Sequence, residues 1–183
     1  MTLSLIIEDG TQVQGANSYI SEADASTYLS NMYGTNNQFT SGGNANGQQT
    51  TALFHGCFAM ERLYGRKYLS WPYMWSKQGL LFPRYLFMDN NMQIWGGNQV
   101  PTPLKYAQAE LALLYMQGTN LFPNESENRL FKMYDVQVGE IKVNKTYWEK
   151  PKDVEHYDGF RKVELILWPV IEAEDNRNAR LTL

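Results

Sequence analysis

The sequence predicts a mainly α-helical fold: a small bundle of about four helices with one β-hairpin and extended N- and C-terminal segments. Apolar residues recur at helical spacing in separate stretches of the chain. Residues 131–148 instead alternate between apolar and polar, as half-buried strands do. The chain has 183 residues, 43% of them hydrophobic, which suits one domain over residues 1–183.

The N-terminal part predicts a short strand followed by a capped helix. Residues 3–10 are expected to form the strand, which ends in the turn pair Asp9-Gly10. Ser21 is expected to cap the helix, with Asp24 three residues later in the acidic variant of a capping box. Gly34 is expected to end it. The apolar face of this helix comprises Ala25, Tyr28, Leu29 and Met32.

Residues 34–49 are polar and of low complexity, and we expect a long loop there. They offer almost no apolar area to offset the entropy that is lost on ordering. A second helix is expected from about residue 50 to about residue 67, weakened by Gly56. Residues 69–100 are rich in Pro, Gly and aromatic side chains, so an irregular but packed segment is expected. The face of the second helix comprises Leu53, Cys57, Met60 and Tyr64.

The third helix has the clearest start and stop signals. Thr102 is expected to cap it, with Pro103 at the first helical position, and Gly118 is expected to end it. Its predicted buried stripe comprises Leu104, Ala107, Leu111, Leu114 and Tyr115. Three small residues would let another helix approach closely: Ala107, Ala109 and Ala112.

The C-terminal part predicts a hairpin, a helix and a tail. The two β-prone halves of residues 131–148 flank Gly139-Glu140, which predicts the turn of a hairpin. A helix is expected from about residue 154 to about residue 168, where Pro169 bends or ends it. The polar residues 172–183 are expected to be extended. The face of the last helix comprises Tyr157, Phe160, Val163 and Leu167.

Composition narrows the function classes. The net charge of -3 gives no whole-protein signal for nucleic acid. Charge is uneven, since residues 1–60 carry acids but no Lys or Arg, whereas residues 62–105 are basic. The single Cys57 excludes an internal disulfide, and the first residues do not resemble a signal peptide. No apolar run reaches the roughly 20 residues of a membrane helix. We therefore expect the protein to be located in a cytoplasm, or in a particle assembled there.

The sequence gives little indication of catalysis. His55 and Cys57 could in principle form a nucleophile pair, but residues two apart on a helix do not face each other. Glu61 and Glu110 are expected on helix surfaces, paired with Arg62, Arg66 or Lys105. No phosphate-binding loop, nucleophile elbow or zinc-ligand spacing is present. We therefore expect no enzyme activity, no metal and no cofactor.

Two sets of residues are candidates for DNA contact. Arg66, Trp71 and Arg84 lie where cations and aromatic rings interleave, which suits single strands because bases stack on rings and cations meet phosphates. The alternative is a loop-rich core whose arginines reach out to water, and the Trp-Pro and Phe-Pro pairs favour it. Lys132, Lys142 and Lys145 could line a DNA channel without reading sequence, or form the solvated side of the hairpin.

Four motifs follow one another along the chain. The first is residues 16–28, which begin Ala16-Asn-Ser-Tyr19 and continue into the capped helix. The second is Phe82-Pro-Arg84. The third is Val100-Pro-Thr-Pro-Leu-Lys-Tyr-Ala-Gln-Ala-Glu-Leu-Ala-Leu113, and the fourth is Val138-Gly-Glu-Ile-Lys-Val143. Together they span nearly the whole chain, and in this order they resemble one family of tailed-phage proteins, the group labelled DnaT-like single-stranded-DNA-binding protein.

Members of this group are similar to head–tail connector, or adaptor, proteins that dock beneath the portal. The resemblance implies a structural virion protein of the neck, assembled in the host cytoplasm. Identical copies would form a ring, typically a dodecamer, that extends the DNA channel and joins head to tail. The implied partners are the portal protein, tail or nozzle proteins, neighbouring copies and packaged DNA, with no membrane. The alternative is a single-stranded-DNA-binding replication accessory protein.

Overall fold

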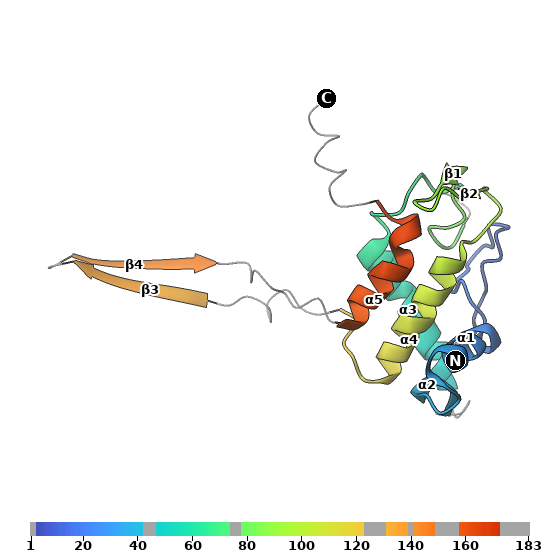
Figure 1. Ribbon diagram of the computed structural model, residues 1–183, viewed down its shortest axis with the longest axis horizontal. Helices are drawn as coiled ribbons and strands as arrows, with labels where there is room; N and C mark the ends of the chain where they lie inside the picture. Colours follow the sequence, from blue (N-terminus) through green and yellow to red (C-terminus); the bar gives the residue numbers. More distant parts are fainter. Residues whose placement is uncertain are drawn as a thin grey trace.

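A computed structural model describes residues 3–41, 47–73, 78–122, 131–138, 141–148 and 158–172, with backbone only for 131–138, 141–148, 158 and 159. These residues form five α-helices and a long antiparallel hairpin, which confirms the predicted fold class (Figure 1). The elements are α1 (Glu22–Tyr33), α2 (Gln38–Ser41), α3 (Gln48–Tyr64), β1 (Phe87–Met88), β2 (Ile94–Trp95), α4 (Thr102–Met116), β3 (Phe131–Val138), β4 (Ile141–Trp148), α5 (Asp158–Leu167) and the 3-10 turn η2 (Trp168–Val170).

Helices α3, α4 and α5 pack side by side, with α4 against both of the others (Figure 1). Helices α1 and α2 lie at one end of this bundle, and β1 and β2 lie at the other (Figure 1). Among the described residues, no helix is long and apolar enough to cross a membrane.

Helix α1 begins and ends as predicted. The hydroxyl oxygen of Ser21 accepts a hydrogen bond from the backbone nitrogen of Asp24 at 3.1 Å, and Gly34 follows the last turn with φ +82°. Ala25 and Leu29 are buried, but Met32 is 53% exposed and does not belong to the buried face. The predicted apolar face was therefore too wide.

The predicted loop over residues 34–49 was wrong in part, because it contains α2 and the start of α3. Phe39 in α2 is completely buried, and its carbonyl oxygen accepts a hydrogen bond from the Gln49 side chain. This one aromatic residue supplies the apolar area that the rest of the segment lacks. Residues 42–46 lie outside the described residues.

Helices α3 and α4 approach closely at Gly56, where a Cβ atom would lie 2.9 Å from the carbonyl oxygen of Gln108 and 3.0 Å from the nitrogen of Ala112. The small residues predicted on α4 are buried, as are Leu53, Cys57, Met60 and Tyr64 on α3. Gly118, with φ +81°, follows the end of α4 as predicted. The predicted start was one residue late, since Pro101 caps α4, and Tyr115 is exposed rather than buried.

The N-terminal segment is extended but is not the predicted strand. Over residues 3–10 it forms a single bridge, between Ile7 and Ser18. The fully buried carboxylate of Glu8 organises the following turn by accepting hydrogen bonds from three backbone N–H groups. Those groups belong to Gly10, Gln12 and Val13. A turn built around a buried acid replaces the ladder of a sheet.

The hairpin forms as predicted, with Phe131 paired to Trp148 and Val138 paired to Ile141. The last helix is confirmed as α5, with Val163 and Leu167 buried, and Pro169 lies in η2, which ends it. The predicted turn at 139–140, the proposed first residues of the last helix at 154–157 and most of the tail, 173–183, lie outside the described residues.

Candidate nucleic-acid interface

A cleft of about 1130 Å³ lies at the C-terminal end of α3. We call it the arginine cleft, because Arg62, Arg66 and Arg84 line it. The remaining lining residues are Phe58, Glu61, Gly65, Tyr68, Leu69, Ser70, Trp71, Pro72, Leu81 and Glu172. It therefore joins three separate stretches of the chain.

Backbone pairing holds these stretches together. Residues 68–72 form isolated bridges on two sides, since Tyr68 pairs with Ile171 and Pro72 pairs with Arg84. The nitrogen of Leu69 donates to the carbonyl oxygen of Val170 at 3.0 Å, and that of Tyr85 donates to Trp71 at 2.9 Å. The wall of the arginine cleft is thus fixed by the backbone, although it has little regular secondary structure.

Arg84 lies on the floor of the arginine cleft and is only 5% exposed. Its Nε donates to the carbonyl oxygen of Ser70 at 3.2 Å, and its Nη2 donates to the same oxygen. The guanidinium carbon lies 5.8 Å from the ring centre of Tyr68 and 5.5 Å from that of Phe82. These contacts fix the cation in place, and burial lowers its pKa, opposed mainly by the charge of Glu61.

Glu61 is the carboxylate on the floor of the arginine cleft. Its Oε1 accepts a hydrogen bond from the hydroxyl of Tyr19 at 2.8 Å, and its Oε2 accepts one from the backbone nitrogen of Leu81 at 2.9 Å. Burial raises the pKa of Glu61 to about 7, against the lowering effects of these hydrogen bonds and of Arg84. The prediction of a surface ion pair for this residue was wrong, because Glu61 anchors the floor instead.

The first motif of the sequence positions this floor. Tyr19, the last residue of Ala16-Asn-Ser-Tyr19, is completely buried. Its hydroxyl donates to Glu61 and accepts from the backbone nitrogen of Phe82 at 3.0 Å, so it joins α3 to the segment that carries Arg84. The nitrogen of Tyr19 donates to the side chain of Gln108 on α4 at 2.8 Å. In this structure the motif fastens the fold together.

The rim of the arginine cleft is open and cationic. Arg62 and Arg66 are exposed, and Trp71 is 70% exposed. The structure therefore brings together Arg66, Trp71 and Arg84, the residues proposed from sequence for single-strand contact. It places them unequally, with Arg84 beneath the surface and the other two in solvent.

Sequence reasoning missed Glu61 and Glu172 as parts of this cleft. Glu61 continues the spacing of four that links Leu53 to Cys57 on α3, which was a usable signal. Glu172 had none, because only the fold brings it there.

The lysines proposed for a DNA channel lie on the hairpin. Lys132 pairs with Tyr147, Lys145 pairs with Tyr134, and Lys142 pairs with Gln137. In this register Lys132 and Lys145 belong to one alternating set of positions and Lys142 to the other. Their proposed DNA contacts stay a prediction.

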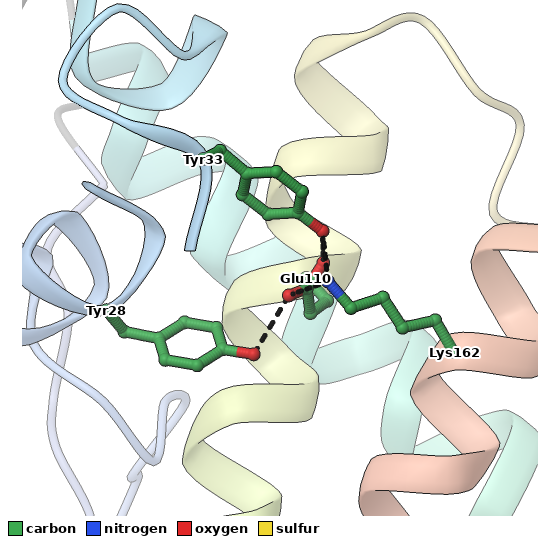
Figure 2. A network of polar contacts seen from close by, with 4 residues as sticks. All are labelled: Tyr28, Tyr33, Glu110 and Lys162. Atoms are coloured by element: carbon green, nitrogen blue, oxygen red, sulfur yellow. Dashed lines mark hydrogen bonds and ion pairs between the residues drawn. The ribbon is translucent and has the colours of Figure 1, made fainter. Parts of the chain in front are cut away.

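A second polar cluster joins α1, α4 and α5 around Glu110 (Figure 2). The carboxylate accepts hydrogen bonds from the hydroxyls of Tyr28 at 2.9 Å and Tyr33 at 2.6 Å, and it pairs with Nζ of Lys162 at 2.9 Å. The predicted pairing of Glu110 on a helix surface was wrong, because this residue is buried. With its donors on α1 and α5 and its acceptor on α4, the cluster serves to hold the bundle together.

His55 and Cys57 do not converge on a common site in this structure. The imidazole of His55 stacks on the ring of Tyr115, 4.5 Å between centres, while Cys57 is buried. Burial, reinforced by the charge of Glu61, raises the pKa of the Cys57 thiol well above its usual value. Among the described residues, no group of His, Cys, Asp and Glu side chains is arranged to hold a metal ion.

Comparison with known proteins places the chain in a family. A family model described as "Putative DnaT-like ssDNA binding protein" matches residues 3–182. The resemblance drawn from the four motifs is thereby confirmed over nearly the whole chain. No curated protein and no solved structure matches.

Proposed function

The chain belongs to the family of DnaT-like ssDNA binding proteins, and we propose that it binds single-stranded DNA in the arginine cleft. One observation carries this proposal: an exposed tryptophan, Trp71, and two exposed arginines, Arg62 and Arg66, line one cleft above a third, buried arginine. Bases stack on aromatic rings whatever their sequence, and arginines neutralise the phosphates between them. The expected ligand is therefore a short stretch of strand without sequence preference.

The experiment is a titration of a fluorescently labelled oligonucleotide with the full chain, followed by fluorescence anisotropy. Trp71→Ala should weaken binding by at least about fivefold, because stacking on an aromatic side chain contributes about 1–3 kcal/mol per base. Trp168→Ala is the matched control, since Trp168 is also exposed but does not line the arginine cleft. Equal loss in both variants, or no binding by the unaltered chain, would refute the proposal.

A second candidate function is that of a head–tail adaptor, a ring of identical copies beneath the portal of a phage. The apolar side chains exposed around β1 and β2 favour it, because exposed apolar surface of this kind marks contact with other proteins. They are Leu86, Met88, Met92 and Ile94. In this role the chain would extend the DNA channel, with Lys132, Lys142 and Lys145 as its DNA contacts.

The adaptor role has its own test in the virus. Particles made without this protein should be full but leak DNA and lack tails, and electron microscopy would reveal this. Purified normal virions should contain the protein, with the portal and tail proteins as neighbours in cross-linking. Virions of normal form without it would exclude the adaptor role and leave DNA binding as the remaining candidate.

A further inference from the structure

Two buried polar atoms on the floor of the arginine cleft have no hydrogen-bond partner in the part of the chain that the structure describes. They are Nη1 of Arg84 and the hydroxyl oxygen of Tyr68. The two side chains adjoin, since the guanidinium lies against the Tyr68 ring, and both residues line the cleft. An unpaired buried donor destabilises a fold, so two of them at the base of one cleft call for an acceptor from outside.

We propose that the floor of the arginine cleft is a seat for the terminal phosphate of a nucleic-acid strand, bound by Arg84 Nη1 and the Tyr68 hydroxyl. This inference rests on the proposed function and names the part of the strand that the cleft selects. Guanidinium and hydroxyl donors suit phosphate oxygens, and a fixed guanidinium loses little freedom when it binds them. Arg62 and Arg66 add two cations above the seat.

Burial argues for the end of a strand. A phosphodiester within a strand carries a sugar on both sides. Because these sugars are bulky, its oxygens cannot reach donors that lie beneath the surface. A terminal phosphate has three free oxygens and carries a charge of about −1.5 to −2 at neutral pH. Both donor atoms are closed to solvent in this structure, so the phosphate must part the side chains above them. Arg62, Arg66 and Trp71, which line the same cleft, are exposed.

Two carboxylates also line the cleft, and their charge opposes a phosphate. Glu61 is occupied by hydrogen bonds from Tyr19 and Leu81, and burial raises its pKa to about 7, so its negative charge is reduced near neutrality. Glu172 is the second. Three arginines line the same cleft, so the positive charges outnumber the negative ones and the lining favours an anion.

The test compares oligonucleotides of one sequence with an internal dye and either a 5′-phosphate, a 3′-phosphate or hydroxyl ends. A phosphate end should strengthen binding to the full chain by about a hundredfold, since each of the two hydrogen bonds to a charged group contributes about tenfold. Tyr68→Phe should remove about tenfold of affinity for the phosphorylated strand and none for the hydroxyl-ended strand. The ring contacts remain, so this variant should fold as well as the unaltered chain, which circular dichroism checks.

Tyr64→Phe is the matched control, because Tyr64 is equally buried at 3% exposure, four residues earlier, and does not line the cleft. Equal affinity for both kinds of strand, or an equal effect of the two substitutions, would overturn the proposal. If binding depends on Trp71 but not on the end phosphate, the terminal-phosphate site is refuted, whereas the proposed binding of single-stranded DNA is supported. If no strand binds, the tryptophan fluorescence is measured while inorganic phosphate is added. A response that Tyr68→Phe abolishes would support a phosphate site but refute DNA as the ligand that supplies the phosphate. No response would refute both the phosphate site and the proposed DNA binding.

Discussion

Lys162 pairs with the buried carboxylate of Glu110 and so links α5 to α4. Replacing it by Met keeps the stem but leaves the carboxylate with two neutral donors, the hydroxyls of Tyr28 and Tyr33. The Lys162 side chain is 36% exposed, so solvent screening reduces the loss. We expect Lys162→Met to lower the free energy of unfolding by about 1–2 kcal/mol.

Urea unfolding followed by circular dichroism measures this difference. Arg161→Met is the control, because Arg161 is the exposed neighbour on the same helix. If the two variants are equally stable, the Glu110 cluster does not contribute to the packing of α5.

Glu61 makes stability depend on pH in a direction that its burial dictates. The pKa of this carboxyl is about 7 in the fold against 4.5 for an ordinary glutamate, so the folded state holds the proton more tightly. This stabilising contribution is complete below about pH 4.5 and is lost as pH rises through about 7. The urea midpoint should therefore fall between pH 5 and pH 8, in a buffer series of about those values. In Glu61→Gln the fall should be smaller, and an unchanged pH profile would contradict this role.

Signals within a few residues predicted the elements well. The Ser21–Asp24 cap, the glycines after α1 and α4, and the alternating pattern of the hairpin each act through local backbone chemistry. The elements that failed depend on partners elsewhere in the chain. Helix α2 exists because Phe39 enters a core built by other helices, and no pattern within residues 34–49 reveals that core.

Gly56 shows the same limit at the contact of α3 with α4. From sequence it is only a weak point in a helix, but the structure places it where the α4 backbone comes nearest. Gly56→Ala should gain helix propensity of about 1 kcal/mol. It must also push apart backbone atoms of Gln108 and Ala112, 2.9 and 3.0 Å from the new Cβ, which costs about 1–3 kcal/mol.

We therefore expect a net loss of stability for Gly56→Ala, measured as a lower thermal midpoint. Asn31→Ala, on an exposed position of α1, carries the propensity gain without the clash and should not lower it. A Gly56→Ala variant more stable than the unaltered chain would mean that the two helices separate at little cost.

At the scale of the whole molecule, the arginine cleft could be predicted only in part. The interleaved cations and rings indicated Arg66, Trp71 and Arg84, and the structure gathers them. It also buries Arg84 between Tyr68 and Phe82, which no spacing could reveal because the contact depends on how three distant segments meet. Arg84 therefore belongs to a packed, loop-rich core, whereas Trp71 lies on the surface, as contact with a single strand requires.

Because the net charge of the chain is -3, DNA must bind at a local group of cations. The salt dependence of DNA binding therefore tests which group of cations the strand contacts. A hydroxyl-ended single strand held by the two rim arginines should show a slope of log affinity against log salt of about −1.4, since each neutralised phosphate contributes about −0.7. Replacing Arg62 and Arg66 by Gln should flatten it to near zero. The control replaces Lys132, Lys142 and Lys145 by Gln and should leave the slope unchanged. A steep slope that only the lysine changes reduce would instead place the DNA along the hairpin, as a channel-lining adaptor requires, because counterion release reports the cations that the phosphates meet.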